Sequence, residues 1–219
     1  MTPPRVVAID GAAGSGKSTL ARALARSLGL PYVNTGVMYR ALAAAALRRG
    51  VADTDDRALL ALTRDLRFTV RLDPPGELEV DGYDANDLTS IEVESTVSKV
   101  ASHALVRAHM RQEQRELGER HGAVMEGRDI ASVVFTDAPV KLYLQARQDL
   151  RAERRAAERA GDVERVATAL GERDRRDAAT TPHKPAPGAT VIDTSELDPE
   201  ATLAAALAVV RQQAPELVP

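Results

Sequence analysis

Residues 6–20 read VVAIDGAAGSGKSTL, and this stretch decides the fold. Residues 5–10 form a short run rich in β-branched and apolar side chains, as expected for a strand buried in a parallel sheet. A glycine-rich turn follows, and then leucines recur every four residues until Gly29 ends the pattern. Strand, glycine loop and helix in this order predict the first unit of a doubly wound α/β sheet.

The glycine-rich turn fits the pattern G-x-x-x-x-G-K-[ST] at every fixed position. Glycines let backbone N–H groups surround phosphate oxygens without a Cβ in the way, and the following helix adds its positive N-terminal end. We expect Lys17 to reach the β- and γ-phosphates and the Ser18 hydroxyl to hold Mg²⁺. The predicted ATP-binding residues are Gly11, Ala12, Ala13, Gly14, Ser15, Gly16, Lys17, Ser18 and Thr19.

Composition narrows the possible partners and compartments. The chain has 219 residues, of which 44% are apolar and 28% charged, so it can bury a substantial core. A net charge of −3 creates no basic field for nucleic acid, and no apolar run of about 18 residues offers a membrane span. The chain has no cysteine, and its first residues lack a signal-peptide layout, so we expect a cytoplasmic protein.

The rest of the pattern alternates helices and strands. Apolar residues alternate at 68, 70 and 72 and again at 78 and 80, with a turn predicted at 73–76, which indicates a hairpin. We predict a single P-loop domain over residues 1–219, a three-layer α/β sandwich whose central parallel sheet is flanked by helices. It carries a small inserted subdomain with the hairpin at about 60–100 and charged helices at about 147–177. Further helices are expected at 37–49, 57–66, about 91–120 and 199–212, and further strands at 122–126, 140–144 and 190–192.

Motifs elsewhere in the chain distinguish among classes of P-loop protein. Asn occurs only at 34 and 86, and neither is followed by Lys, so the N-K-x-D motif of GTPases is absent. No apolar strand ends in Asp-Glu, as motor or transporter ATPases require. A kinase that acts on a small phosphate-bearing acceptor needs arginines from several segments to neutralise two polyanions. Arg40, Arg107, Arg128 and the 151–176 region are the candidates.

Six further motifs, in order, accompany the loop: NTGVMYR (34–40), SKVAS (98–102), EGRDIASVVF (126–135), APVKLYL (138–144), ERDRRD (172–177) and VIDTSEL (191–197). With them the sequence closely resembles bacterial cytidylate (CMP) kinases, which are P-loop nucleoside monophosphate kinases, from Val6 to about Leu207. The resemblance implies ATP-dependent phosphorylation of CMP and dCMP with Mg²⁺ as cofactor. It also implies that residues 1–219 form a single P-loop kinase domain, in which the subdomain at about 60–100 binds the monophosphate and the helices at about 147–177 form a lid.

The resemblance also implies roles for individual residues. Around the cytosine ring, a carboxylate such as Asp129 would accept from the N4 amino group while Arg107 donates to N3 and O2, so uracil would fit poorly. The implied CMP-binding residues are Thr35, Arg40, Ser98, Arg107, Arg128, Asp129, Arg173 and Asp177. The expected catalytic residues are Lys17, Arg128, Arg154 and Arg155, with Ser18 on the metal.

Some alternatives stay open at this point. The family usually has Asp at position 34 and Arg at position 180, where this chain has Asn and Thr. Asp10 could support Mg²⁺ through water or cap a loop. The charged helices at 147–177 could be ordinary solvated helices. A kinase for UMP or AMP, or a non-catalytic nucleotide-binding module, would share the loop. We expect a monomer.

Overall fold

The computed structural model describes residues 4–72, 76–159, 162–181 and 184–219. The central strands are β1 (Val6–Gly11), β2 (Tyr32–Asn34), β5 (Ala123–Gly127), β6 (Val140–Gln145) and β7 (Thr190–Asp193), and a separate hairpin consists of β3 (Phe68–Val70) and β4 (Leu78–Val80). The helices are α1 (Lys17–Leu28), α2 (Thr35–Arg49), α3 (Asp56–Asp65), α4 (Ile91–Val100), α5 (Ala104–His121), α6 (Gln148–Arg159), α7 (Val163–Thr180) and α8 (Pro199–Gln213). A π-helical turn, η1 (Ile130–Val134), follows β5, and a 3₁₀ turn, η2 (Pro215–Leu217), follows α8.

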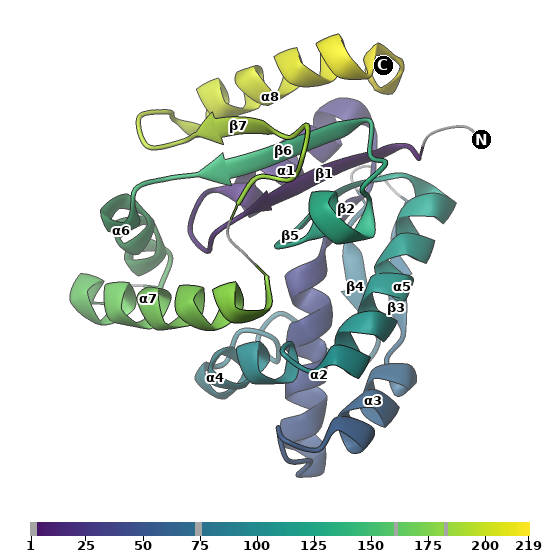
Figure 1. Cartoon of the computed structure of the whole chain (residues 1–219), viewed down its shortest axis with the longest axis vertical. Helices are drawn as coiled ribbons and strands as arrows, with labels where there is room; N and C mark the ends of the chain where they lie inside the picture. Colours follow the sequence, from purple (N-terminus) through teal and green to yellow (C-terminus); the bar gives the residue numbers. More distant parts are fainter. Residues whose placement is uncertain (1–3, 73–75, 160–161, 182–183) are drawn as a thin grey trace.

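The central sheet has the strand order β2-β5-β1-β6-β7, and every pairing in it is parallel (Figure 1). β1 lies in the middle because it pairs with β5 on one side and with β6 on the other. The carboxyl ends of all five strands therefore meet at one edge of the sheet. Ligands bind at this edge in open α/β sheets, next to the strands where the order reverses.

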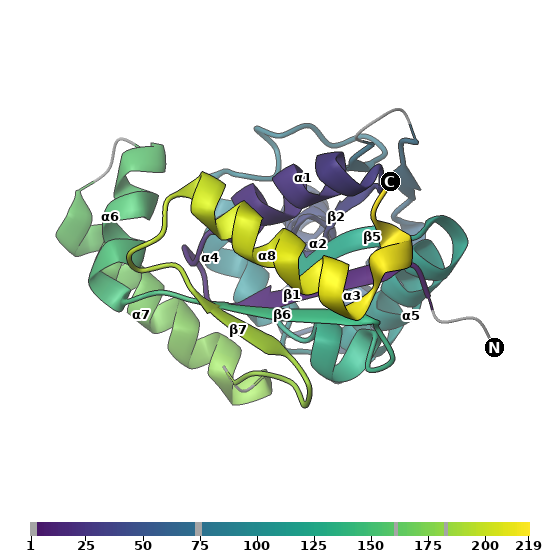
Figure 2. The same cartoon turned by 90° about the horizontal axis from the view of Figure 1, so that it is seen from above.

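Helices cover both faces of the sheet, and the alternation along β1 explains why. Val7 and Ile9 are fully buried in one apolar cluster with residues of α1 and α8. Val6 and Ala8 are fully buried in the other cluster, with residues of α2 and α5. Figure 2 shows α1 and α8 together over the first of these faces. The predicted three-layer arrangement is confirmed.

The hairpin and the helices α2 to α5 form the lower part of the molecule in Figure 1. The predicted hairpin is present, with Phe68 opposite Val80. Buried residues of this segment, such as Leu59 and Val97, belong to the same apolar cluster as Val6 of the central sheet. This segment therefore packs continuously with one face of the core. Its predicted turn at 73–76 lies almost wholly outside the described residues, and its status as an inserted subdomain stays a prediction.

The structure differs from the predicted pattern in three places. β2 was not predicted, because three residues are too few to show alternation and the strand exists through its pairing with β5. The helix expected over about 91–120 is two helices. Between them, the His103 ring contacts the Asp56 carboxylate and the Asp53 carbonyl, so the break accompanies a tertiary contact. The third difference is η1, which depends on a side chain from β1.

That side chain is Asp10, which caps η1 at the carboxyl end of β1. Its Oδ1 accepts from the N–H of Ile130 at 2.8 Å, and its Oδ2 accepts from the N–H of Ala131 at 2.9 Å. The residue is 3% exposed. Burial raises the pKa of Asp10 from its ordinary 3.8 to about 6, although the two backbone hydrogen bonds act in the opposite direction. Of the two roles left open by the sequence, the structure shows loop capping.

The substitution Asp10→Asn tests this account through the pH dependence of stability. Because the pKa of Asp10 is higher in the folded protein, the folded state binds the proton more tightly than the unfolded state. The stabilisation by the protonated group is complete below about pH 4 and is lost as the pH rises through about 6. We expect the free energy of unfolding of the wild type, relative to the variant, to fall by up to roughly 3 kcal/mol between pH 4 and 7. Urea denaturation across this range measures it, and a pH-independent difference would contradict the account.

Candidate nucleotide site

The glycine-rich loop lies at the carboxyl edge of the sheet, between β1 and α1. Gly14 and Gly16 have positive φ angles of 75° and 88°, which residues with a Cβ rarely adopt. Gly16 directly precedes α1, so the loop ends at the positive N-terminus of that helix. The backbone therefore has the conformation expected of a phosphate-binding loop.

Side chains from other segments bind the carbonyl groups of this loop. Arg151 of α6 donates to the carbonyl of Ala13 at 3.0 Å, and Thr194, after β7, donates to the carbonyl of Ser15 at 3.1 Å. In a planar trans peptide the next N–H points away from the carbonyl. The N–H groups of Gly14 and Gly16 therefore point away from Arg151 and Thr194. Neither of these two residues lines the cavity described below.

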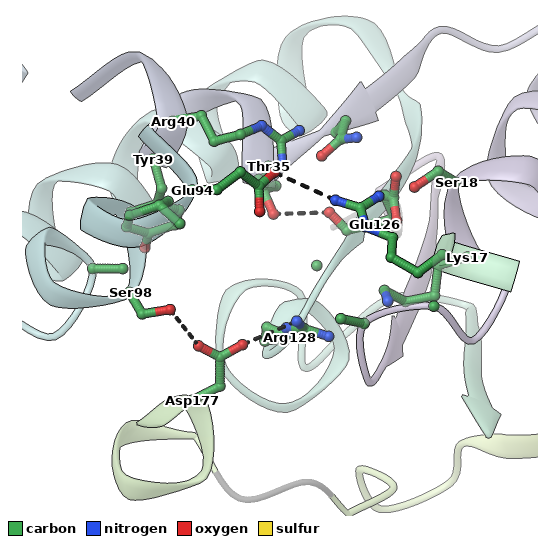
Figure 3. Close-up of a pocket in the computed structure, with 18 of the residues that line it drawn as sticks. Lys17, Ser18, Thr35, Tyr39, Arg40, Glu94, Ser98, Glu126, Arg128 and Asp177 are labelled. Atoms are coloured by element: carbon green, nitrogen blue, oxygen red, sulfur yellow. Dashed lines mark hydrogen bonds and ion pairs between the residues drawn. The ribbon is translucent and has the colours of Figure 1, made fainter. Parts of the chain in front are cut away.

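A cavity of about 1130 Å³ opens beside the loop (Figure 3). Pockets for one small ligand usually measure about 300–1,000 Å³, so this cavity has room for two nucleotide moieties. The sequence-predicted residues that line it are Ala13, Gly14, Lys17, Ser18, Thr35, Arg40, Ser98, Arg107, Arg128, Asp129, Arg155 and Asp177. Groups predicted from distant parts of the chain thus meet in one space.

The remaining predicted residues lie around this space. The loop positions Gly11, Ala12, Ser15 and Gly16, together with Thr19 of α1, are not among the lining residues. Arg154 does not line the cavity either, because it donates to the side chain and the carbonyl of Thr194 at 3.1 and 2.7 Å. Its expected place at the transferred phosphate stays a prediction. The side chain of Arg173 lies outside the described part of the chain.

Arg40 and Thr35 extend from α2 at one end of the cavity. Thr35 Oγ1 donates to the carbonyl of Glu126 at 2.8 Å, which joins the start of α2 to the end of β5. The Arg40 guanidinium lies beside Glu94 (Figure 3). Burial lowers its pKa, while the charges of Glu94 and Glu126 act in the opposite direction. Arg40 Nε is buried and has no hydrogen-bond partner among the described residues, so this guanidinium has donor capacity for an anion.

Asp129, just after β5, accepts from two arginines of α5. Arg107 Nη2 lies 2.6 Å and Arg111 Nη2 lies 2.8 Å from its Oδ2. Arg107 also donates to Thr181 Oγ1 at 2.9 Å. The side chains of Arg107 and Asp129 are 12% and 9% exposed, so a nearly buried ion pair forms part of the cavity wall. A carboxylate and a guanidinium here are the two groups that the cytosine ring would need.

Asp177 of α7 connects three parts of the wall. It accepts from the Ser98 hydroxyl of α4 at 3.3 Å and lies 2.9 Å from Arg128 Nη2 (Figure 3). Arg128 in turn donates to the carbonyl of Gly11 at 2.6 Å. The predicted lid helix, the helix before α5 and the glycine loop are therefore joined through charged and polar side chains.

Two arginines of α6 contact residues around the cavity. Arg155 lines the cavity, and its Nη2 lies 3.3 Å from Glu94 Oε1. Arg151, which holds the loop, also pairs with Asp174 of α7 at 2.7 Å. Both α6 and α7 thus contribute charged groups around the cavity, as the lid interpretation of the 147–177 region requires.

Sequence comparison places this site in a known family. The sequence profile of the cytidylate kinase family matches residues 7–212. The chain belongs to the cytidylate kinase family. The cytidylate kinase of Roseiflexus castenholzii is 43% identical over 95% of this chain and 94% of that protein. Those of Geobacillus kaustophilus and Deinococcus radiodurans are 40% and 42% identical over 94% of this chain and cover 96% and 100% of their own lengths. The resemblance and the P-loop nucleoside monophosphate kinase fold are confirmed.

One part of this cytidylate kinase site was not predicted, a hydrogen-bond chain that ends on Glu126. The Tyr32 hydroxyl donates to Glu126 Oε1 at 2.5 Å and accepts from Asn34 Nδ2 at 3.1 Å. Burial and the Glu126 charge raise the pKa of Tyr32, so its hydroxyl stays protonated and donates. The ring packs against Arg22, whose guanidinium carbon lies 4.9 Å from the ring centroid. Asn34, where the family usually has Asp, supplies a donor that a carboxylate would lack.

Position 180 is the second departure from the family pattern. Thr180 lines the cavity, and its hydroxyl donates to the carbonyl of Asp177 at 3.1 Å. The side chain therefore closes a hydrogen bond at the end of α7 and does not extend a charge into the cavity as an arginine would. Phosphate contacts must come from the arginines of the other elements.

Several functional candidates escaped the sequence prediction for different reasons. Glu126 ends the apolar part of β5, so the rule that ligands bind at strand ends could have identified it. Arg111 is four residues beyond Arg107 and shares its helix face, which is also a usable signal. Glu94 offers no such signal, because a single acid on a charged helix usually faces solvent.

The donor set around the loop fits a magnesium–nucleotide complex. Ser18 supplies a hydroxyl oxygen to the cavity, and in such sites Mg²⁺ takes most other ligands from phosphates and water. Within the described ranges no group of three or more His, Asp or Glu side chains could hold a metal ion by itself. The described helices include none that is long and apolar enough to cross a bilayer.

The substitution Tyr32→Phe tests the hydrogen-bond chain. It keeps the ring against Arg22 but leaves the buried Glu126 carboxylate without its donor, so we expect a loss of about 1–3 kcal/mol in the free energy of unfolding. Tyr83→Phe is the matched control, because Tyr83 also lies under an arginine but is only partly buried. The control should change stability by less than about 0.5 kcal/mol. Equal losses in both variants, measured by urea denaturation, would rule out the proposed importance of the chain.

Proposed function

We propose that this protein transfers the γ-phosphoryl group of ATP to the 5′-phosphate of CMP or dCMP, which yields ADP and CDP or dCDP. The observation that carries the proposal is the single cavity in which the glycine loop and the Arg40, Arg107 and Arg128 side chains meet. Membership of the cytidylate kinase family agrees with it. In this arrangement the two nucleotides lie end to end, with the phosphates between them.

The loop end of the cavity suits the triphosphate. Backbone N–H groups of the loop and the N-terminus of α1 surround the β-phosphate, and Lys17 neutralises charge on the transferred group. In the present structure Lys17 Nζ donates to the carbonyl of Ala12 at 2.6 Å, so the ammonium group already lies at the loop. Ser18 would hold Mg²⁺, which when bound neutralises phosphate charge.

The opposite end suits the monophosphate. Arg40 and Arg128, with the Thr35 hydroxyl, bind the acceptor phosphate, while Asp129 and Arg107 with Ser98 recognise the base. Arg173 and Asp177 reach the sugar side. These assignments follow the family resemblance, and the position of all but the Arg173 side chain in one cavity wall supports them.

Catalysis then depends on positioning and charge. The acceptor phosphate is already anionic at neutral pH, so no strong general base is needed, and attack in line with the leaving ADP oxygen requires only alignment. The arginines and Lys17 stabilise the charge spread over the transferred group. Movement of α6 and α7 over the phosphates would bring Arg154 and Arg155 close and exclude water.

We also propose an oligomeric state and a cellular compartment for the protein. All the groups invoked come from one chain, so we propose that it acts as a monomer. Its substrates are small nucleotides, and nothing in the mechanism requires nucleic acid or a membrane. ATP and CMP are cytoplasmic metabolites, and we place the enzyme in the cytoplasm.

The decisive experiment is a coupled ADP-release assay with ATP, Mg²⁺ and each monophosphate in turn. We expect CMP and dCMP to support the fastest turnover. Preference for UMP or AMP would replace the proposal with another nucleoside monophosphate kinase. ATP binding without ADP release on any acceptor would indicate a non-catalytic nucleotide-binding module.

The substitution Lys17→Ala tests the role of the loop. Loss of charge stabilisation at the transferred group should lower kcat by roughly a thousandfold or more. The Lys17 side chain donates to a carbonyl of the loop and is not part of either apolar cluster, so the circular dichroism spectrum and thermal stability should change little. Near-normal turnover in a folded variant would contradict the mechanism.

The substitution Asp129→Ala tests base recognition. It removes the acceptor for the N4 amino group, so the ratio of kcat/KM for CMP to that for UMP should fall by about a hundredfold. The KM for ATP should stay within about twofold, because the loop end is unaffected. An unchanged acceptor ratio would show that another group reads the base.

A further inference from the structure

We infer that Arg111 is a positioning residue that holds the Asp129 carboxylate in the orientation that reads cytosine, an inference that rests on the proposed function. Arg111 does not line the cavity, and the family resemblance gave it no role. It lies on α5 behind the proposed base-binding pair, four residues after Arg107 and therefore on the same face of the helix.

The contacts of Asp129 motivate this inference. Arg107 Nη2 donates to Oδ2 at 2.6 Å, and Arg111 donates to the same oxygen through Nη2 at 2.8 Å and Nε at 3.3 Å. Within the described residues, both arginines therefore bind a single oxygen of the carboxylate. In the proposed complex the other oxygen, Oδ1, would accept from the amino group, so neither arginine would be displaced.

In the ligand-bound enzyme, Arg107 cannot be the only hydrogen-bond donor and counter-charge of Asp129. It already divides its donors among Asp129, the Thr181 hydroxyl and the carbonyl of Ala101. To bind N3 and O2 of cytosine it must turn at least one N–H group toward the base. Arg111 faces no such demand, so it remains as the constant counter-charge of the carboxylate.

The surroundings of Asp129 make a constant counter-charge necessary. Its side chain is 9% exposed, and the nearby carboxyl of Asp10 interacts with it unfavourably. The Tyr39 hydroxyl, also close to this group, is neutral. A buried carboxylate with a like charge nearby is favourable only when a cation is paired with it.

The orientation of this carboxylate decides how the base is read. A carboxylate only accepts hydrogen bonds, so an oxygen directed at the base edge favours the N4 amino group of cytosine over the O4 carbonyl of uracil. Arg111 thus acts on specificity through Asp129, because it fixes the direction of the accepting oxygen.

The test compares Arg111→Met with Arg115→Met in the full-length protein. Arg115 is one turn further along α5 and also pairs with a carboxylate, Asp137 at 2.6 Å, but it does not line the cavity or contact Asp129. Kinetic constants are measured for CMP, UMP and ATP. We expect Arg111→Met to lower the CMP/UMP ratio of kcat/KM by about 10–100-fold, mainly through the KM for CMP, with the KM for ATP unchanged.

Two further variants make the result decisive. Arg111→Lys keeps the positive charge and should restore most of the ratio, which a purely structural role of the guanidinium would not predict. If Arg111→Met does not fold, Arg111→Gln takes its place with the same expected ratio.

An unchanged ratio in a folded, uncharged variant, or an equal loss in Arg115→Met, would overturn the inference. If the wild type did not use CMP at all, the proposed function would fail, and the assay of the wild type alone would show it.

Discussion

Buried arginines need counter-charges, and this requirement organises the space around the cavity. Arg107, Arg128 and Arg155 each pair with an acidic residue of a different element. The pairs connect α5 with the segment after β5, that segment with α7, and α6 with α4. Helices α6 and α7 carry few large apolar residues, so apolar burial alone stabilises their position only weakly. Their ion pairs with other elements of the cavity wall stabilise it further.

The same pairs explain how one set of side chains serves both the free and the occupied site. A phosphate group offers more charge than a carboxylate and can accept two parallel hydrogen bonds from one guanidinium. Under the proposed function, an incoming acceptor would compete with Glu94 and Asp177 for guanidinium groups that are already partly shielded from water. The exchange would replace one anionic partner with another, which costs less than desolvating an unpaired charge.

The sequence predicted the loop, the helix after it, the hairpin and the positions of most strands, because each has a local pattern of glycine or apolar residues. It did not predict β2, the break before α5 or η1, which depend on pairing with β5, on the contacts of His103 and on the Asp10 carboxylate. The family resemblance brought most of the site residues together. It assigned no role to Glu126 or Arg111, although the end of β5 and the helix face of Arg107 were usable signals; their contacts with Tyr32 and Asp129 became visible only in the structure.

The contact between Arg151 and the carbonyl of Ala13 has a mechanical consequence. Arg151 also holds Asp174, so a single guanidinium joins the loop to both α6 and α7. While these bonds persist, the two helices can rotate about this point but cannot separate from the loop by translation. A swing of their far ends would then tilt the loop amides as well. In the proposed mechanism, grip on the triphosphate and approach of the helices would be one motion rather than two.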